Sequence, residues 1–302
     1  MSFSAMERLM RTGLTRGMAE MTNQSTFMVT AGRGTTGRRV VRALREQGFA
    51  VRAASRSSEQ HFDWLDQSSW GPALEGVGAV YLVPFDPEPL TPAFVRSAVE
   101  TGVRRVVLLS GRGVDVPGYG GEGNDAVAHH LAGEEAVRAS GVEWTIVRPG
   151  WFAQNFSEGF LRGDVLSGEL RLPAADVPAS FVDAEDIAAV VAAALTGAGH
   201  CGQVYELSGP RSLTMGEVAS EISRGTGRDV RYVPLPSEEF VAELIRQGYT
   251  EEDARSFERT LSPIRLGLDS HLSDGVRRAL GRGLRDFTDF VQDAETSGAW
   301  NN

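Results

Sequence analysis

The chain of 302 residues is 41% hydrophobic and carries a formal net charge of −10, a composition that suits one large α/β domain or a domain with a smaller lobe. The acidic balance argues against nucleic acid or an anionic membrane as a partner, because such surfaces attract concentrated positive charge. A single cysteine, Cys201, excludes an intramolecular disulfide framework. The sequence shows no signal-peptide pattern and no long apolar span, so we expect a cytoplasmic monomer or homodimer that acts on a small molecule.

Residues 1–22 show no clear apolar face, and we expect an N-terminal extension whose order the sequence leaves open. From residue 23 onward, short apolar runs alternate with helical ones. The predicted strands are 26–31, 49–55, 79–85, 104–111 and 143–150, and the predicted helices are 37–47, 91–102 (with Thr91 as N-cap) and 126–140. Apolar strands separated by helices of this length predict a doubly wound parallel α/β sheet, covered on both faces.

The chain changes character after residue 150. An alanine-rich helix over 181–197 precedes one more strand at 202–209, and Thr214 with Glu217 forms a capping box. Ser237 and Thr250 are further predicted N-caps. We therefore expect a sheet domain over 23–155, to which 186–209 returns, and a small, mostly helical lobe made of 156–185 and 210–302.

Three glycines, Gly32, Gly34 and Gly37, follow the first strand with the spacing G-x-G-x-x-G. This is the strand-to-helix context in which backbone N–H groups bind a dinucleotide pyrophosphate. A plain turn would need one glycine. Three glycines, with Thr35 and Thr36 between them, therefore favour phosphate binding.

The second strand bears on the choice of dinucleotide. It runs into Ser55 and Arg56, and no carboxylate follows until Glu59, whereas an NAD site usually places an acidic residue there. Arg33 in the glycine loop is a second candidate cation. The pattern favours NADP(H), although a solvated surface role for Arg56 remains the alternative.

Five segments together resemble the NmrA-like branch of the atypical short-chain dehydrogenase/reductases, from about Thr26 to near the C-terminus. They are VTAGRGTTGRRVVRAL, VRAASRSS, RRVVLLSG, EEAVRASGVEWTIVRPGWFAQNF and FVDAEDIAA. The resemblance implies a Rossmann domain, a small C-terminal substrate lobe, a cleft between them and NADP(H) as cofactor. Members of this family include quinone and dye reductases, tailoring reductases of secondary metabolism, and dinucleotide sensors without catalysis.

The resemblance also implies the cofactor contacts. The glycine loop would be Ala31 to Gly37, with Ala31 standing where the family often has a glycine. The ends of the fourth and fifth strands and the family's P-x-x-F-x-x-N segment would supply the others: Pro84, Phe85, Ser110, Gly111, Pro149, Trp151, Phe152 and Asn155. Apart from this motif, Trp151 and Phe152 would be interpreted as core aromatics.

Catalysis cannot follow the common Tyr-x-x-x-Lys pattern, because the sequence contains no lysine. The position at which NmrA-like proteins often keep a lysine corresponds to His130, beside His129. We expect His130 to contact the nicotinamide ribose or to donate a proton. The alternative is a pair of polar residues without a ligand, and at least one of the two must point away from the cleft because helix neighbours lie about 100° apart.

Two more catalytic candidates lie near the predicted edge of the sheet. Ser110 is either a hydrogen-bond donor to a ligand or a strand-terminal capping residue. Tyr119 lies in a glycine-rich segment, 111–123, that we expect to act as a lid, although an exposed tyrosine without a partner is the alternative. The remaining histidines are isolated, so no metal site is predicted.

These residues lead to one main hypothesis and two alternatives. The main hypothesis is an NADPH-dependent reductase of a quinone, enone, iminium or aromatic carbonyl compound, a type used to tailor secondary metabolites. Solvent can supply the proton to such acceptors, so the missing Tyr/Lys pair is not decisive. The alternatives are a dinucleotide redox-sensing regulatory protein without catalysis, and an isomerase or lyase with a bound dinucleotide.

Overall fold

A six-stranded parallel sheet forms the centre of the computed structural model, which describes residues 26–58, 61–119 and 124–301. The predicted extension 1–22 lies outside these residues. The strands follow the order β2-β1-β3-β4-β5-β9, with bounds Val51–Ala53, Thr26–Val29, Val77–Leu82, Arg105–Leu109, Glu143–Pro149 and Gln203–Leu207. The order reverses between β1 and β3, and doubly wound sheets bind ligands at the carboxyl ends of such strands. The predicted fold class is confirmed.

Two strand numbers were wrong. Pro84 and Ser110 follow the third and fourth strands, β3 and β4, rather than the fourth and fifth. The described residues between β2 and β3 form a 3-10 turn, η1 (Gln67–Ser69), and the short helix α3 (Trp70–Leu74) instead of another strand.

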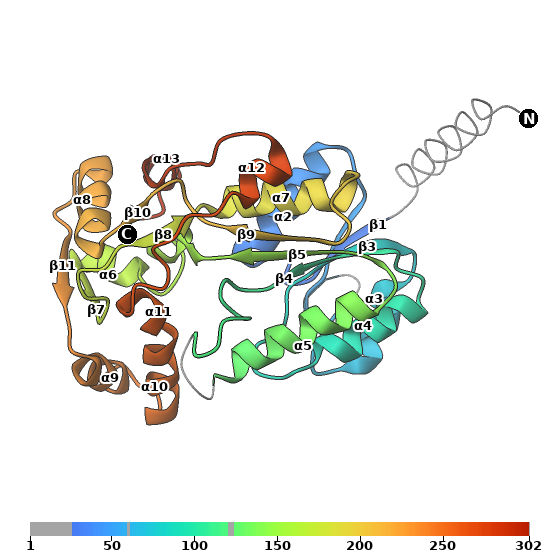
Figure 1. Cartoon of the computed structure of the whole chain (residues 1–302), viewed down its shortest axis with the longest axis horizontal. Helices are drawn as coiled ribbons and strands as arrows, with labels where there is room; N and C mark the ends of the chain where they lie inside the picture. Colours follow the sequence, from blue (N-terminus) through green and yellow to red (C-terminus); the bar gives the residue numbers. More distant parts are fainter. Residues whose placement is uncertain (1–25, 59–60, 120–123, 302) are drawn as a thin grey trace, which may run out of the picture.

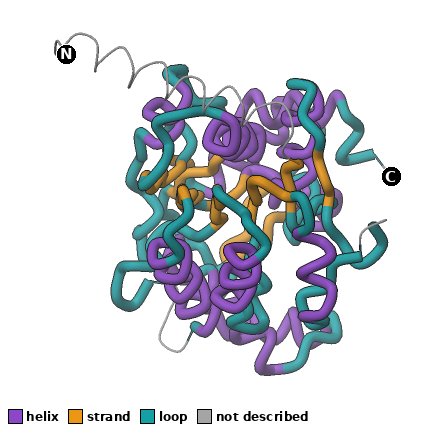
Figure 2. Tube along the Cα trace, turned by 90° about the vertical axis from the view of Figure 1, so that its right-hand side faces the viewer, coloured by secondary structure: helices purple, strands orange, loops and turns teal. Residues whose placement is uncertain are grey.

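Helices cover both faces of this sheet. On one face lie α2 (Thr35–Glu46), α7 (Ala184–Thr196) and α12 (Gly275–Leu280), and on the other lie α3, α4 (Thr91–Glu100) and α5 (Asp125–Ala139) (Figure 1). Figure 2 shows the strands as a middle layer between helices. Val40 and Val190 are buried against the first face, and Trp70 and Phe94 against the second.

Polar side chains fix where several helices begin. Asp183 accepts a hydrogen bond from the Glu185 N–H at the start of α7, and Thr214 with Glu217 forms the predicted capping box of α8 (Met215–Thr226). Thr250 caps α10 (Glu251–Thr260), as predicted.

Two predicted caps were wrong. The N-cap of α4 is Leu90, so Thr91 is the first helical residue. Pro236 precedes α9 (Ser237–Arg246), and the Ser237 hydroxyl donates to Glu258 at 2.6 Å instead of capping its own helix.

The second part of the chain has a hydrophobic core of its own, which includes Phe156, Phe181 and Phe287. It contains a three-stranded sheet, whose strands in order are β10 (Ser212–Leu213), β8 (Ala179–Val182) and β6 (Trp151–Phe152). A two-stranded sheet pairs β11 (Arg231–Pro234) with β7 (Glu169–Leu172). Besides α8, α9 and α10, the described helices of this part are α6 (Arg162–Ser167), α11 (Ser262–Arg265) and α13 (Phe287–Thr296). Val276 of α12 packs with the large sheet, although it lies within the range 210–302 that the sequence assigns to the lobe.

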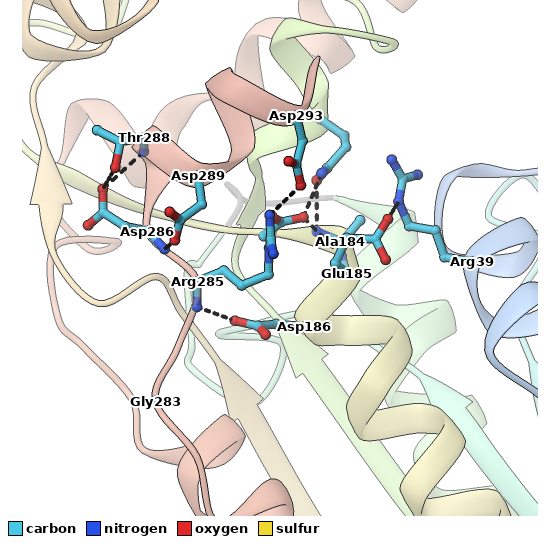
Figure 3. Close-up of polar contacts among 12 residues, drawn as sticks. Arg39, Ala184, Glu185, Asp186, Gly283, Arg285, Asp286, Thr288, Asp289 and Asp293 are labelled. Carbon is cyan, nitrogen blue, oxygen red and sulfur yellow. Dashed lines mark hydrogen bonds and ion pairs between the residues drawn. The ribbon is translucent and has the colours of Figure 1, made fainter. Parts of the chain in front are cut away.

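An ionic network joins the two parts at the start of α7 (Figure 3). Arg285 donates from Nε to Asp183 at 2.6 Å and from its backbone N–H to Asp186 at 2.8 Å. Both carboxylates are nearly inaccessible to solvent, at 3% and 1% exposed. Gln154 adds a hydrogen bond to Asp183 at 2.7 Å. The segment before α13 is thereby fixed to α7 and to the turn after β6.

Candidate functional site

The glycine loop connects β1 to α2, and its three glycines are needed for different structural reasons. A Cβ on Gly37 would lie 2.2 Å from the Ala31 carbonyl oxygen, and a Cβ on Gly32 would lie 2.8 Å from the Ala53 Cβ. These two glycines are therefore required by internal packing. A Cβ on Gly34 would meet only Ala31 atoms, at 3.2 Å and beyond, so Gly34 is the member of the set whose backbone is open to a ligand.

Ala31 holds the loop in a strained conformation. Its φ of 50° lies in the left-handed region that favours glycine. Its carbonyl oxygen accepts the Gly34 N–H at 2.8 Å, which tightens the turn. The substitution of alanine for glycine at this position therefore leaves the turn geometry in place.

The N-terminus of α2 is open to an anion. Gly34 is the N-cap, no side chain caps the helix, and the first turn contains no acidic residue. Free N–H groups and the helix dipole therefore favour a phosphate at this end. The Thr36 hydroxyl faces inward, since it accepts a hydrogen bond from the Tyr81 hydroxyl at 2.9 Å, while Thr35 is only half-buried.

Arginine and serine side chains meet beside the end of β2. Arg33 donates from Nη1 to the Ser57 hydroxyl at 2.8 Å, and the Ser55 hydroxyl oxygen lies 3.5 Å from that of Ser57. Arg56 is exposed in the same turn, and Glu59 lies outside the described residues. The structure therefore brings the predicted cation Arg33 to the strand end where Arg56 stands.

Ser110, which directly follows β4, belongs to a buried ionic cluster with Glu134 and Arg148. Its hydroxyl donates to Glu134 Oε1 at 2.7 Å, and Arg148 donates to both Glu134 oxygens at 2.7 and 2.6 Å. Burial raises the pKa of Glu134, but the hydrogen bonds from Arg148 and Ser110 outweigh it and hold that pKa below its ordinary value. The Ser110 proton is therefore directed to Glu134, which ties α5 to β4 and β5.

A cavity of about 470 Å³ opens where the carboxyl ends of the strands face the second part of the chain. It brings together predicted residues from three separate segments. They are Gly111, Tyr119, His130, Pro149, Trp151, Phe152 and Asn155. Pro84 and Phe85 are half-buried after β3 and do not line it.

His130 is the histidine of the pair that lines this cavity. Its Nε2 lies 3.5 Å from Asp86 Oδ1, and its Nδ1 is buried without a hydrogen-bond partner among the described residues. Burial lowers the pKa of His130 despite the nearby Asp86, so the imidazole is neutral at neutral pH. His129 turns to the backbone instead, with Nδ1 2.8 Å from the Asp86 carbonyl oxygen.

Tyr119 has a partner that the sequence did not indicate. Its hydroxyl donates to Asp269 Oδ1, and Trp151 Nε1 donates to Asp269 Oδ2 at 2.9 Å. Asp269 is completely buried, and burial raises the pKa of Tyr119. The tyrosine is thus a neutral donor that joins the segment after β4 to the segment before α12.

Arg112 is the second residue that sequence reasoning missed. It follows the end of β4, lines the same cavity, and its side chain is 1% exposed. Its Nη1 donates to the Ser180 hydroxyl at 2.9 Å. The only sequence signal was its place two residues after Ser110, in a segment interpreted as a lid.

A second cavity, of about 580 Å³, lies between α2 and α13. Two of its arginines pair with carboxylates of the same cavity: Arg39 contacts Glu158 at 2.7 Å and Glu185 at 2.9 Å, and Arg42 contacts Glu185 at 2.6 Å. These two arginines therefore already have carboxylate partners.

Across the described ranges, no helix is long and apolar enough to span a membrane.

Comparison with known proteins identifies one family, two curated relatives and one solved structure that this chain resembles. A family model described as the NmrA-like family matches residues 23–262. The (4-alkanoyl-5-oxo-2,5-dihydrofuran-3-yl)methyl phosphate reductase of Streptomyces griseus is 33% identical over 277 residues, which cover 87% of this chain and 96% of that protein. The NAD(P)H azoreductase of Xenophilus azovorans is 30% identical over 287 residues, with coverage of 88% and 96%. The structure of Citrobacter sp. triphenylmethane reductase complexed with NADP(H) shares the fold, with a TM-score of 0.71 at 22% identity over 89% of this chain and 99% of that one.

Proposed function

Because the chain belongs to the NmrA-like family, we propose that it is an NADPH-dependent reductase that transfers a hydride to a conjugated or aromatic small molecule. The two relatives compared above are both named as reductases, which supports the predicted class of enzyme, an NAD(P)H-dependent oxidoreductase. One observation carries the proposal. The uncapped N-terminus of α2 and the cavity lined by Trp151 and Phe152 lie at the same edge of the parallel sheet, where its strands end.

The residues present fit a dinucleotide phosphate. The first-turn N–H groups of α2, which the open backbone at Gly34 leaves accessible, would hold the pyrophosphate, and Arg33 with Arg56 would hold the 2′-phosphate. Trp151 and Phe152 supply an aromatic wall for the nicotinamide, with Asn155 beside them. Bound NADPH supplies the hydride.

The groups available for proton transfer in the cavity indicate which class of hydride acceptor suits it. No lysine can assist a tyrosine, and the Tyr119 proton is directed to Asp269. The neutral imidazole of His130 is a hydrogen-bond donor and not an acid, so acceptors whose reduced form takes its proton from solvent suit this arrangement, which favours quinones, enones and iminium ions over simple ketones. The Streptomyces relative is named for a 5-oxo-2,5-dihydrofuran, a conjugated carbonyl compound, and this supports the same class.

Calorimetric titration with NADPH, NADP⁺, NADH and NAD⁺ tests the cofactor site. We expect NADPH to bind at least about tenfold more tightly than NADH, since each charge-assisted phosphate contact contributes about 1.5–3 kcal/mol. Arg33→Ala and Arg56→Ala should remove this preference and leave NADH affinity unchanged. Arg96→Ala, an exposed arginine of α4, is the matched control. Equal affinities for NADPH and NADH would contradict the 2′-phosphate site.

A dinucleotide redox sensor without catalysis is the second candidate, favoured by the absence of lysine from the sequence. A sensor should prefer the oxidised dinucleotide and should not oxidise NADPH in the presence of menadione or a cationic dye. A reductase should bind NADPH productively and consume it. The two measurements together distinguish the candidates.

A further inference from the structure

The Arg112 guanidinium is buried beside the cavity with part of its hydrogen-bonding capacity unused. Nη1 donates to the Ser180 hydroxyl at 2.9 Å and to the His271 carbonyl oxygen at 3.2 Å. Nε lies 3.1 Å from Glu206 Oε1, an ion-pair distance without hydrogen-bond geometry. Nη2 is buried and has no hydrogen-bond partner among the described residues.

An unpaired guanidinium N–H group in a protein interior is unfavourable, because its hydration is lost and nothing replaces it. Folded proteins seldom leave such a group without a partner, and where no protein group serves, an ordered water, an ion or a ligand takes that place. Arg112 and Gly150 both line the cavity. A Cβ on Gly150 would stand 3.4 Å from Arg112 Cζ, so the missing side chain leaves the guanidinium face close to the cavity.

The groups around Arg112 indicate which kind of ligand atom could accept a hydrogen bond from its Nη2. Glu206 pairs with Arg112, and Asp269 lies two residues before His271, whose carbonyl Arg112 contacts. Glu206 pairs with Nε, so Nη2 is the donor that remains for a ligand. A carbonyl oxygen that gains negative charge during reduction fits such a donor, and Arg112 cannot itself lose a proton.

We propose that Arg112 is a further catalytic residue, which donates from Nη2 to the acceptor's carbonyl oxygen and stabilises the negative charge that forms there. This inference rests on the proposed reductase function. A conjugated acceptor takes the hydride from NADPH at its β-carbon, where a C–H bond forms. The π electrons shift toward the carbonyl, which becomes an enolate oxygen beside Arg112. NADPH is oxidised to NADP⁺, and solvent later protonates the enolate.

Two acceptors separate this role from a structural one. Menadione develops charge on oxygen when it is reduced, whereas malachite green, a cationic dye, takes the hydride at carbon and forms no oxyanion. We expect Arg112→Gln to lower kcat with menadione by about 100-fold, as the loss of an oxyanion donor does elsewhere, and to change kcat with the dye by less than about threefold.

Gly150→Ala is the second variant, because its methyl group would cover the guanidinium face at ordinary contact distance and leave the Arg112 contacts intact. It should lower menadione turnover while the dye rate is retained. Arg96→Gln is the control that should change neither rate. Equal losses with both acceptors, or none with menadione, would overturn the proposal.

A binding measurement gives an answer that does not depend on turnover. The protein is saturated with NADP⁺ and titrated with 4-nitrophenol, which ionises near neutral pH to a coloured phenolate. Wild-type protein should bind the phenolate in preference to the phenol, and Arg112→Gln should lose this preference. If wild-type protein reduces neither acceptor, the proposed function fails, and this titration still decides on Arg112: no phenolate preference, or a preference that Arg112→Gln retains, would overturn its role.

Discussion

His130 places a titratable ring in a cavity wall where its charged form is disfavoured. Burial lowers its pKa from the ordinary value of 6.5, so below pH 6.5 the unfolded chain binds a proton that the folded protein does not. The free energy of unfolding should therefore fall as the pH falls through this window and be fully retained above it. His200, whose pKa is also lowered by burial, contributes in the same direction.

We expect His130→Gln to make the stability less dependent on pH. The measurement is the urea midpoint of wild-type and variant protein at pH 7.5 and 5.5, where the difference between the two midpoints should be smaller in the variant. The slope that remains is expected from His200 and from carboxylates. An unchanged difference would show that His130 is not shielded from solvent as the structure has it.

Residues that line the cavity were predictable only where a local pattern marked them. His130, Trp151 and Phe152 stood in motifs, and they do line the cavity. Asp269 is 150 positions away from Tyr119, its partner, and stands in a segment without a pattern. Arg112 was concealed by composition, since arginine is this protein's only strong base. Contacts between distant segments depend on packing that one sequence does not display.

At the scale of elements, the glycine loop has two functions: its close packing positions α2, and its open backbone leaves room for a phosphate. The Gly37 Cα faces the Ala31 carbonyl, and a Cβ there would lie 2.2 Å from that oxygen. Gly37→Ala should push α2 away from the loop, weaken NADPH binding at least about tenfold and destabilise the fold by about 1–3 kcal/mol, as overpacking typically does.

Gly163→Ala is the matched control for that change. Gly163 lies within α6 and is exposed, and a Cβ added there would meet no atom within 4 Å. Alanine should stabilise this helix by about 0.5–1 kcal/mol and leave NADPH binding unchanged. Calorimetry and urea unfolding of both variants check the pair. Tight NADPH binding by Gly37→Ala would show that the loop does not need this close approach.

Element types were predictable because the sheet strands are short apolar runs, separated by helical stretches, and the residues of each element display this themselves. Boundaries were less so. Thr91 and Ser237 look like caps, but each became the first helical residue, preceded by Leu90 and Pro236. The choice between two adjacent positions depends on the approach of the preceding loop, which is a property of the fold and not of the local residues.

At the scale of the whole molecule, the two hydrophobic cores are joined by buried charge. Arg285, in the segment before α13, donates to Asp183 and Asp186 at the start of α7, and it also contacts the exposed Asp293 (Figure 3). Both α7 carboxylates are almost fully buried. Since α7 packs on the large sheet and α13 on the lobe, this one guanidinium acts on their relative position.

Arg285→Ala should therefore cost more than the loss of an ordinary surface ion pair. It leaves Asp183 buried without its cation, and the removal of one partner of a buried pair costs about 3–5 kcal/mol. Partial exposure of the Arg285 side chain, 29%, reduces the expected loss to about 2–4 kcal/mol. Arg224→Ala is the matched control: that side chain is 68% exposed and pairs with Glu221 within one helix, so its loss should cost under about 1 kcal/mol. Urea unfolding followed by far-UV circular dichroism measures both variants. Equal losses would mean that solvent already screens Arg285, and that other contacts hold the lobe against the sheet.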